Sequence, residues 1–165
     1  IANLYFVAMS EIPEMKEELH NDGKNYCGFC YCGGVEFEVA NSATPHISVY
    51  CHCESCRRAH SAPLYQVVYI PLECLNITKG QELVKVFVKP GGTVKRSFCS
   101  DCGSKVTIQY SAENIGFFPA LLEESIQHNL PEKFAPTHHY LSHETVLKLD
   151  LLNDLPEKFA PTHHY

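Results

Sequence analysis

Residues 98–103 read Phe-Cys-Ser-Asp-Cys-Gly, a Cys-x-x-Cys turn that is followed by glycine. This spacing offers two sulfur atoms to one metal ion, because the glycine lets the chain fold tightly behind them. Zinc in a closed structural site takes four ligands, so the pair Cys99 and Cys102 needs two more. Cys30 and Cys32, in the stretch GFCYCGG, supply them from much earlier in the chain. The sequence therefore predicts a four-sulfur structural zinc that ties the first strand to a late hairpin.

A second cysteine group has a different character. The stretch CHCESCRR begins at Cys51 and also holds Cys53 and Cys56. Three protein ligands and one open position are typical of a reactive zinc rather than a structural one. The open position would take water, a substrate thiolate or a fourth side chain, for which His52 and His60 are the candidates. A second structural site that a distant residue completes is the alternative interpretation.

The chain has nine cysteines, an odd number that a closed set of disulfides cannot use up. No signal peptide is visible, so we expect a cytoplasmic, reducing location, where closely spaced cysteines usually bind metal. We therefore expect two zinc ions per chain, the second with lower occupancy. Cys74 falls in an expected strand and is interpreted as an inert core residue. Cys27, beside the first group, is either a spare oxidisable thiol or an ordinary surface cysteine.

Composition limits the classes of function. The chain has 165 residues, is 45% hydrophobic and carries a formal net charge of −6. The length fits one domain, and the apolar fraction is too high for a disordered chain. No stretch approaches the roughly 20 apolar residues of a membrane helix, so we expect no membrane association. The negative charge argues against a nucleic-acid partner, and no GxGxxG or GxxxxGK[ST] motif suggests a nucleotide.

Both ends of the chain stand apart from the middle. Residues 1–9, IANLYFVAM, resemble the remnant of an engineered protease-cleavage tag, with a genuine apolar N-terminus as the alternative. We interpret 10–26 as an N-terminal extension with a short helix at 11–20. Near the other end, LPEKFAPTHHY occurs twice, at 130–140 and at 155–165. The paired histidines of the two copies are either duplicated loop residues, which we favour, or a metal site; they are His138, His139, His163 and His164.

The middle of the chain has the pattern of short strands. VEFEV at 35–39 alternates apolar and acidic side chains with a period of two, as a half-buried strand does. KPGG at 89–92 predicts a hairpin turn, and ALLEESI at 120–126 is the best helical stretch of the second half. We expect a mainly β domain with few short helices. Further strands, rich in β-branched and aromatic residues, are predicted at 46–50, 64–70, 83–88, 93–98 and 105–110.

The three cysteine motifs, GFCYCGGVEFEV, CHCESCRRAHSAP and FCSDCG, resemble in order and spacing the glutathione-dependent formaldehyde-activating enzyme (GFA) family, also called the centromere-protein-V (CENP-V) domain family. LPEKFAPTHHY and DLPEKF are similar to its C-terminal half. The resemblance implies a β-tent fold of small antiparallel sheets organised around zinc. It places the domain at 27–159, which leaves 160–165 as a tail. It also implies a structural zinc at the first four cysteines and a catalytic zinc at the other three.

The resemblance implies a reaction as well. The family's reaction joins glutathione and formaldehyde into S-hydroxymethylglutathione, which makes it a carbon–sulfur lyase type read in reverse. The expected partner is thus a small-molecule thiol such as glutathione, and the expected catalytic residues are Cys51, Cys53 and Cys56. Zinc favours the thiolate form of a thiol whose ordinary pKa is about 8.5. The alternative is a non-catalytic, zinc-stabilised interaction module, as some family members are thought to be.

Side chains beside the second cysteine group are candidates for contacts with the substrate. Arg57 and Arg58 would bind a glutathione carboxylate through bidentate hydrogen bonds, or form an ordinary solvated basic pair. His60 would act as a general base near pKa 6.5, or be a loop histidine without a role. This histidine and Ser61 stand where the family usually has a small hydroxyl residue and glycine, which changes the polarity beside the reactive site. Tyr65 is expected to be a packing residue.

Overall fold

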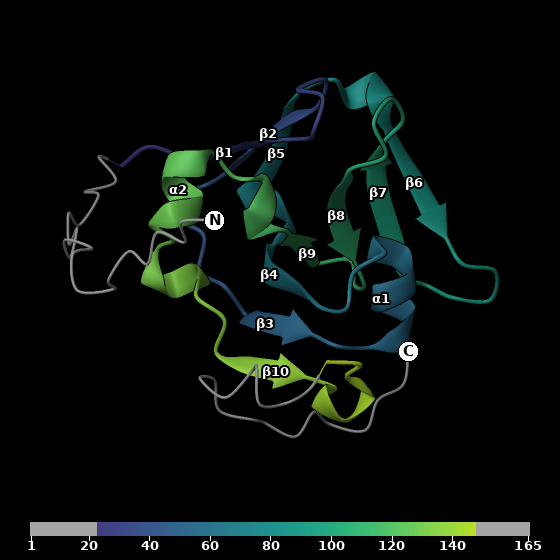
Figure 1. Cartoon of the computed structure of the whole chain (residues 1–165). Helices are drawn as coiled ribbons and strands as arrows, with labels where there is room; N and C mark the ends of the chain where they lie inside the picture. Colours follow the sequence, from purple (N-terminus) through teal and green to yellow (C-terminus); the bar gives the residue numbers. More distant parts are fainter. Residues whose placement is uncertain (1–22, 148–165) are drawn as a thin grey trace, which may run out of the picture.

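The computed structural model of the protein describes residues 23–147. Two β-sheets make up most of the regular secondary structure of this part of the chain, and two short α-helices accompany them (Figure 1). The mainly β fold that the sequence predicts is thereby confirmed. The tag remnant expected at 1–9, the helix at 11–20 and the tail at 160–165 lie outside the described residues.

The smaller sheet has three antiparallel strands in the order β1-β2-β5. Its strands are β1 (Tyr26–Phe29), β2 (Glu36–Val39) and β5 (Leu75–Lys79). In β2 the side chains of Phe37 and Val39 are buried, whereas Glu36 and Glu38 remain partly exposed. The alternation in the sequence therefore corresponds to one core-facing side and one solvent-facing side of this strand.

The larger sheet has seven strands in the order β10-β3-β4-β9-β8-β7-β6. They are β3 (Ile47–Cys51), β4 (Tyr65–Pro71), β6 (Val84–Val88), β7 (Lys95–Cys99), β8 (Lys105–Gln109), β9 (Asn114–Phe117) and β10 (His138–Tyr140). The turn predicted at 89–92 joins β6 to β7, whose ends Val88 and Lys95 are paired.

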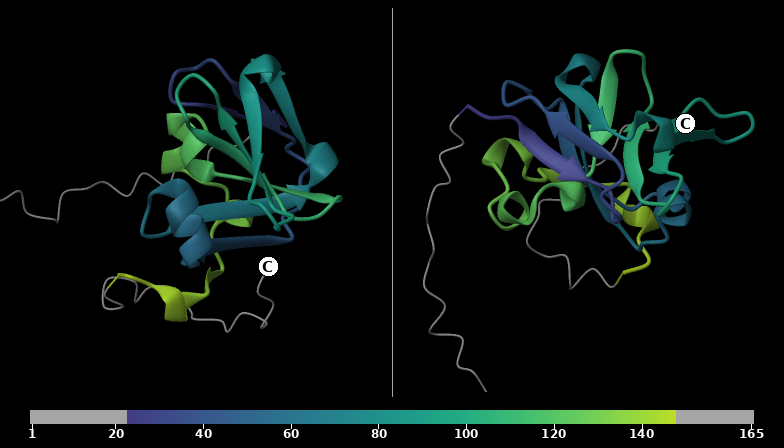
Figure 2. Two further views of the ribbon diagram at one scale, coloured as in Figure 1. Left: turned by 90° about the vertical axis from the view of Figure 1, so that its right-hand side faces the viewer. Right: turned by 90° about the horizontal axis from the view of Figure 1, so that it is seen from above.

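One strand pair departs from the expected antiparallel sheets, because β10 runs parallel to β3. A long stretch of chain separates these two strands, so no hairpin fixes their relative direction. In both views of Figure 2 the yellow-green segment with β10 lies on the same side of the molecule as α1. The late part of the chain thus returns to the strand that carries the second cysteine group.

The helices are short. They are α1 (Glu54–His60) and α2 (Glu124–His128), together with the 3-10 turns η1 (Leu72–Cys74), η2 (Gln81–Leu83), η3 (Pro119–Leu121), η4 (Glu132–Phe134) and η5 (Ser142–Glu144). The single helix expected at 120–126 is wrong in its bounds, since Leu122 is extended, fully buried and bridged to Gly28. Burial of this leucine outweighs the helix propensity of its neighbours. Within residues 23–147 no helix is long and apolar enough to cross a membrane.

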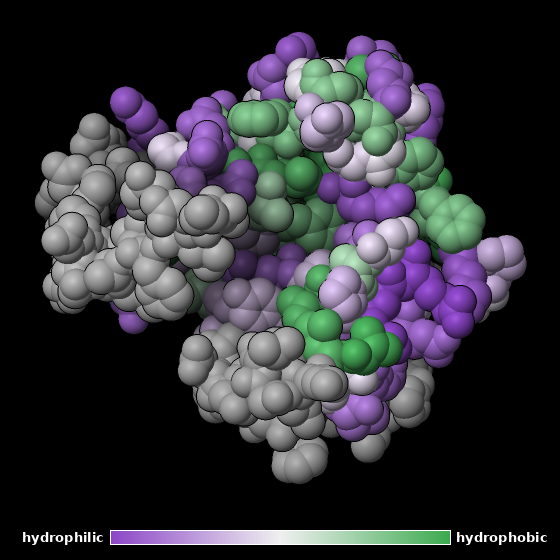
Figure 3. All heavy atoms as spheres, in the orientation of Figure 1, coloured by the Kyte–Doolittle hydropathy of each residue, from purple (hydrophilic) through white to green (hydrophobic). Residues whose placement is uncertain are grey.

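The main core joins side chains from both sheets. Phe134 of η4 is fully buried and meets the rings of Tyr26 and Phe117 edge-on, with centroid distances of 5.0 Å and 5.3 Å. Cys74 packs at the edge of this core from η1, just before β5 rather than within a strand. Figure 3 shows apolar side chains in the recessed middle of one face, with hydrophilic side chains over the region of α1. A second apolar cluster, which includes Val67, surrounds the second cysteine group.

Candidate metal centres and the adjoining cavity

Four cysteines from two turns bring their sulfur atoms together between the two sheets. Cys30 and Cys32 lie in the turn from β1 to β2, Cys99 ends β7 and Cys102 lies in the turn to β8. Their Sγ atoms lie within 4.8 Å of one another, with 3.5 Å between Cys30 and Cys32 and 3.9 Å between Cys32 and Cys99. Sulfur atoms bound tetrahedrally to zinc at about 2.3 Å are about 3.8 Å apart. This four-thiol cluster therefore has the spacing that zinc requires.

Backbone geometry and hydrogen bonds shape the two turns of the four-thiol cluster. Gly33 and Gly103 each follow a cysteine and have φ angles of 71° and 77°, which residues with a side chain rarely adopt. The backbone N–H of Tyr31 donates to Ser104 Oγ at 3.0 Å, so the turns of the two sheets are directly linked. Hydrogen bonds with Ser104 lower the pKa of the Cys102 thiol to about 6, which favours the thiolate that a metal needs.

The second cysteine group lies where β3 ends and α1 begins. Cys51 is the last residue of β3, Cys53 is the N-cap of α1, and Cys56 lies within the helix. Their Sγ atoms lie within 4.8 Å of one another. The backbone N–H of Cys56 donates to Cys53 Sγ at 3.3 Å, so a sulfur caps the helix in place of the usual oxygen. The structure thus gathers the three sulfurs that the sequence groups.

Electrostatics in this three-thiol cluster favour a bound cation. Hydrogen bonds from the Cys51 and Cys53 thiols lower the pKa of Cys56 to about 2, whereas the contacts with Cys53 and Cys56 raise the pKa of Cys51. Without a metal the cluster therefore holds one thiolate, at Cys56, and the loss of a second proton is unfavourable. A divalent cation removes this restriction, because it stabilises all three as thiolates. The all-sulfur donor sets of both clusters fit zinc.

Neither histidine that was considered as a fourth ligand joins the three sulfurs. His52 is fully buried, and its Nε2 lies 2.7 Å from Nδ1 of His139. The His60 ring stacks on Tyr65, with centroids 4.1 Å apart and planes 14° apart. Over residues 23–147, no histidine nitrogen or carboxylate oxygen completes the three-thiol cluster. Its sulfurs instead border a cavity.

The cavity has a volume of about 430 Å³. Three lining residues, Tyr69, Ile108 and Arg96, belong to one row across the larger sheet, in which Gly116 stands between Tyr69 and Ile108 as their register partner. Glycine is required in this row, since a Cβ on Gly116 would lie 2.7 Å from Ile108 Cγ2 and 2.8 Å from Tyr69 Cε1. Most of the lining is apolar or aromatic. It comprises Ile47, Val49, Cys51, Cys53, Glu54, Ser55, Cys56, Tyr65, Val67, Tyr69, Val94, Arg96, Ile108, Tyr110, Tyr140, Leu141 and Glu144.

Comparison with known proteins identifies the family of the chain. The sequence profile of the family described as glutathione-dependent formaldehyde-activating enzyme (GFA) matches residues 25–144. The chain belongs to this family. The matched range contains both cysteine clusters. A crystal structure of a Rhodobacter sphaeroides protein is similar, with 29% sequence identity and a TM-score of 0.52, and the match covers 64% of this chain and 95% of that chain.

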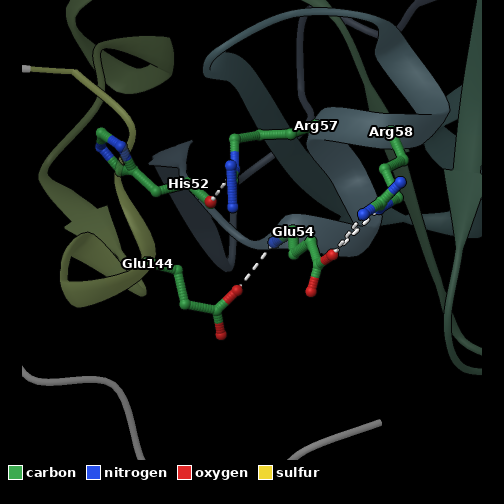
Figure 4. A network of polar contacts seen from close by, with 5 residues as sticks. All are labelled: His52, Glu54, Arg57, Arg58 and Glu144. Carbon is green, nitrogen blue, oxygen red and sulfur yellow. Dashed lines mark hydrogen bonds and ion pairs between the residues drawn. The ribbon is translucent and has the colours of Figure 1, made fainter.

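In this GFA-family chain the two arginines that the sequence singled out do not line the cavity. Arg57 Nε donates to the backbone oxygen of His52 at 3.0 Å, and Arg58 donates two hydrogen bonds to Glu54 Oε1 at 2.8 Å and 2.9 Å (Figure 4). The Arg58 side chain is 78% exposed, as expected of a solvated surface residue. A role of either arginine in substrate binding stays a prediction.

Two charged residues that line the cavity, Arg96 and Glu144, were not singled out from the sequence. Arg96 lies on β7 and donates from Nη2 to Ser55 Oγ at 3.3 Å, while Glu144 Oε2 accepts the backbone N–H of Glu54 at 2.7 Å (Figure 4 shows the latter contact). Strand alternation places Val94 and Arg96 on one face, yet alternation does not say which face meets a cavity. Glu144 is too distant in sequence from the cysteines for any local signal.

The paired histidines of the first repeat do not form a metal site with another ligand in residues 23–147. His139 is buried against His52, and His138 Nδ1 lies 2.9 Å from the hydroxyl of Thr137. The histidines of the second copy, His163 and His164, lie outside the described residues. The favoured interpretation as loop histidines is wrong in its setting, because both residues lie in β10, where pairing with β3 holds them.

Proposed function

We propose that this GFA-family chain is a zinc-dependent enzyme of the carbon–sulfur lyase type that acts on glutathione adducts. The reaction we assign is the formation of S-hydroxymethylglutathione from glutathione and formaldehyde. The main observation in support of this proposal is that the three thiols of Cys51, Cys53 and Cys56 border a cavity of about 430 Å³. Small-molecule sites have volumes of about 300–1,000 Å³. The description of the family supports glutathione as the thiol.

The two cysteine clusters have different roles in this proposal. The four-thiol cluster would hold a zinc that joins the turns of the two sheets and stabilises the fold. The three-thiol cluster would hold a second zinc next to the cavity. Zinc in the second position would supply a Lewis acid that lowers the pKa of a bound thiol or water.

The assigned reaction is balanced without an oxidant or a reductant. The glutathione thiol loses its proton, and a lone pair of the sulfur forms the new bond to the carbon of formaldehyde. The π electrons of the carbonyl group move to its oxygen, which takes up a proton. The cavity residues contribute by holding the two reactants together, which is the main source of acceleration that this geometry offers.

Tyr65 and His60 form the wall beside Cys56. Burial raises the pKa of Tyr65 well above its ordinary value, so its hydroxyl stays protonated and donates a hydrogen bond to the Cys56 sulfur. Burial also lowers the pKa of His60 to about 4, which makes this histidine a weak base at neutral pH. We therefore assign His60 the role of supporting Tyr65 by stacking, rather than that of the general base near pKa 6.5.

The proposal is tested with protein purified without chelator. We expect about two zinc ions per chain by atomic emission, and faster exchange between free and glutathione-bound ¹³C-formaldehyde in NMR spectra than in protein-free buffer. Cys53→Ser should abolish the acceleration. Cys27→Ser is the matched control, because Cys27 belongs to neither cluster, and should leave the acceleration intact.

A second readout does not depend on turnover. In cobalt-substituted protein, millimolar glutathione should change the visible absorption, since a new sulfur ligand alters the cobalt spectrum. No spectral response together with no acceleration of exchange would refute the enzyme proposal. The chain would then be a zinc-stabilised binding module of the same family.

A further inference from the structure

The charged residues of the cavity differ in how fully they are paired. Three lining residues carry a formal charge, namely Arg96, Glu54 and Glu144. Glu54 accepts two hydrogen bonds from Arg58, and Glu144 accepts the backbone N–H of Glu54. Both carboxylates are therefore engaged at the start of α1. Arg96 is the single cationic residue in the lining.

The guanidinium of Arg96 has hydrogen-bond donors that no protein acceptor in residues 23–147 uses. Its Nη2 makes one long hydrogen bond of 3.3 Å to Ser55 Oγ. Its Nε is buried and makes no hydrogen bond within residues 23–147. A buried guanidinium N–H without an acceptor is costly, and a planar guanidinium suits a carboxylate that accepts two parallel hydrogen bonds. The side chain is thus positioned for an anionic group inside the cavity.

The location of Arg96 next to the sulfurs gives this donor a specific role. Arg96 and the three cysteines line the same cavity, and its hydrogen bond to Ser55 holds the guanidinium beside the residue that precedes Cys56. Three thiolates and one zinc ion carry one net negative charge, so an anionic ligand would be repelled by the cluster alone. A guanidinium at the same cavity offsets this repulsion.

We propose that Arg96 anchors a carboxylate of the substrate and thereby makes the cavity selective for thiols that carry a carboxylate. This inference rests on the proposed function, because it takes the cavity to be the thiol site. It assigns to Arg96 the contact that the sequence suggested for Arg57 and Arg58, both of which lie outside the lining. Arg96 is a residue for substrate binding here and takes no part in bond formation.

The test compares two ligands by isothermal titration calorimetry on the zinc-loaded protein. Glutathione carries two carboxylates, and glutathione diethyl ester keeps the thiol and the amine but carries none. The wild-type protein should bind glutathione about 10- to 100-fold more tightly than the ester, as expected for charge-assisted hydrogen bonds. In Arg96→Gln this preference should fall to about 3-fold or less. Lys95→Gln is the matched control and should keep it, because Lys95 is the exposed neighbour of Arg96 on β7 and lies outside the lining.

The ratio of the two affinities separates recognition from damage. A variant whose cavity is merely disturbed weakens both ligands alike and keeps the ratio, which would overturn the proposal. Zinc content is measured in parallel, and Arg96→Lys is included because it keeps the positive charge beside the sulfurs but not the planar fork. With zinc retained, this variant should also show a reduced preference, and an unchanged preference in both variants would overturn the proposal.

The outcome also distinguishes the two levels of inference. If the wild-type protein binds glutathione and the ester equally well, the role of Arg96 is refuted while the proposed function stands. If it binds neither ligand and does not accelerate exchange, the proposed function fails, and the role of Arg96 fails with it.

Discussion

Replacing Phe134 with alanine should destabilise the fold more than any surface change. The side chain is fully buried between Tyr26 and Phe117, at centroid distances of 5.0 Å and 5.3 Å and interplanar angles of 74° and 82°. Loss of a buried phenylalanine costs about 3–5 kcal/mol of unfolding free energy. The two edge-on ring contacts supply about 0.5–1.5 kcal/mol each of that amount. For a chain of this length the change corresponds to a decrease in Tm of about 6–20 °C.

The assay is thermal unfolding followed by circular dichroism in zinc-saturated buffer, with urea unfolding for the free energy. The chain offers a matched control, because the side chain of Phe87 is 53% exposed. Phe87→Ala makes the same chemical change at the surface. A loss below about 1 kcal/mol in Phe134→Ala, or an equal loss in Phe87→Ala, would refute the attribution of the effect to core burial.

Four further predictions follow from the site. Chelation should lower Tm and restored zinc should recover it, whereas a Tm that ignores chelator would contradict the metal assignment. Arg58→Gln should change the unfolding free energy by no more than about 0.5 kcal/mol, because its ion pair is exposed; a larger loss in urea unfolding would be unexpected. The pKa of His60 is lowered to about 4 in the folded protein, so between pH 6.5 and 4 the unfolded chain takes up a proton at this residue and the folded protein does not. The free energy of unfolding should therefore decrease as the pH is lowered from 6.5 to 4. Urea unfolding at several pH values should show a smaller decrease in His60→Phe. Gly116→Ala should lower the unfolding free energy by about 1–3 kcal/mol through overpacking. A Tm equal to that of the wild type would contradict this, since it would mean that the side chains of Ile108 and Tyr69 move aside without cost.

The parts of the site that the sequence predicted are those set by short spacing. Cys99 and Cys102 belong to one Cys-x-x-Cys turn, so their sulfurs lie close together whatever the rest of the fold. A structural zinc needs four ligands, and this requirement pointed to Cys30 and Cys32 as the other pair. The strands with β-branched and aromatic residues were found within a residue or two, because their pattern is local. The centre of the larger sheet was missed at β9, where Asn114 and Gly116, which are uncommon in strands, make up half of the four residues.

The parts that the sequence did not predict depend on tertiary contacts. Leu122 lies in a stretch with good helix propensity, yet its burial and its bridge to Gly28 hold it extended. β10 has three residues and forms by parallel pairing with β3, which no local signal announces. Arg96 belongs to a strand distant in sequence from the three cysteines, whereas Arg57 and Arg58 adjoin them. Nearness in sequence therefore did not indicate which arginine lines the cavity, because strands from elsewhere in the chain form part of its wall.

The late position of β10 and η5 has a consequence for how the protein is made. All ligands of both clusters have been synthesised once Cys102 is added, but Tyr140, Leu141 and Glu144 of the cavity wall follow much later. At about 5–20 residues per second, translation of 103–144 takes roughly 2–8 s. During that interval the nascent chain presents the three-thiol cluster without its wall. Zinc supplied during expression therefore meets the cluster before this part of the wall exists, whereas zinc added to the finished protein meets it with Tyr140, Leu141 and Glu144 in place.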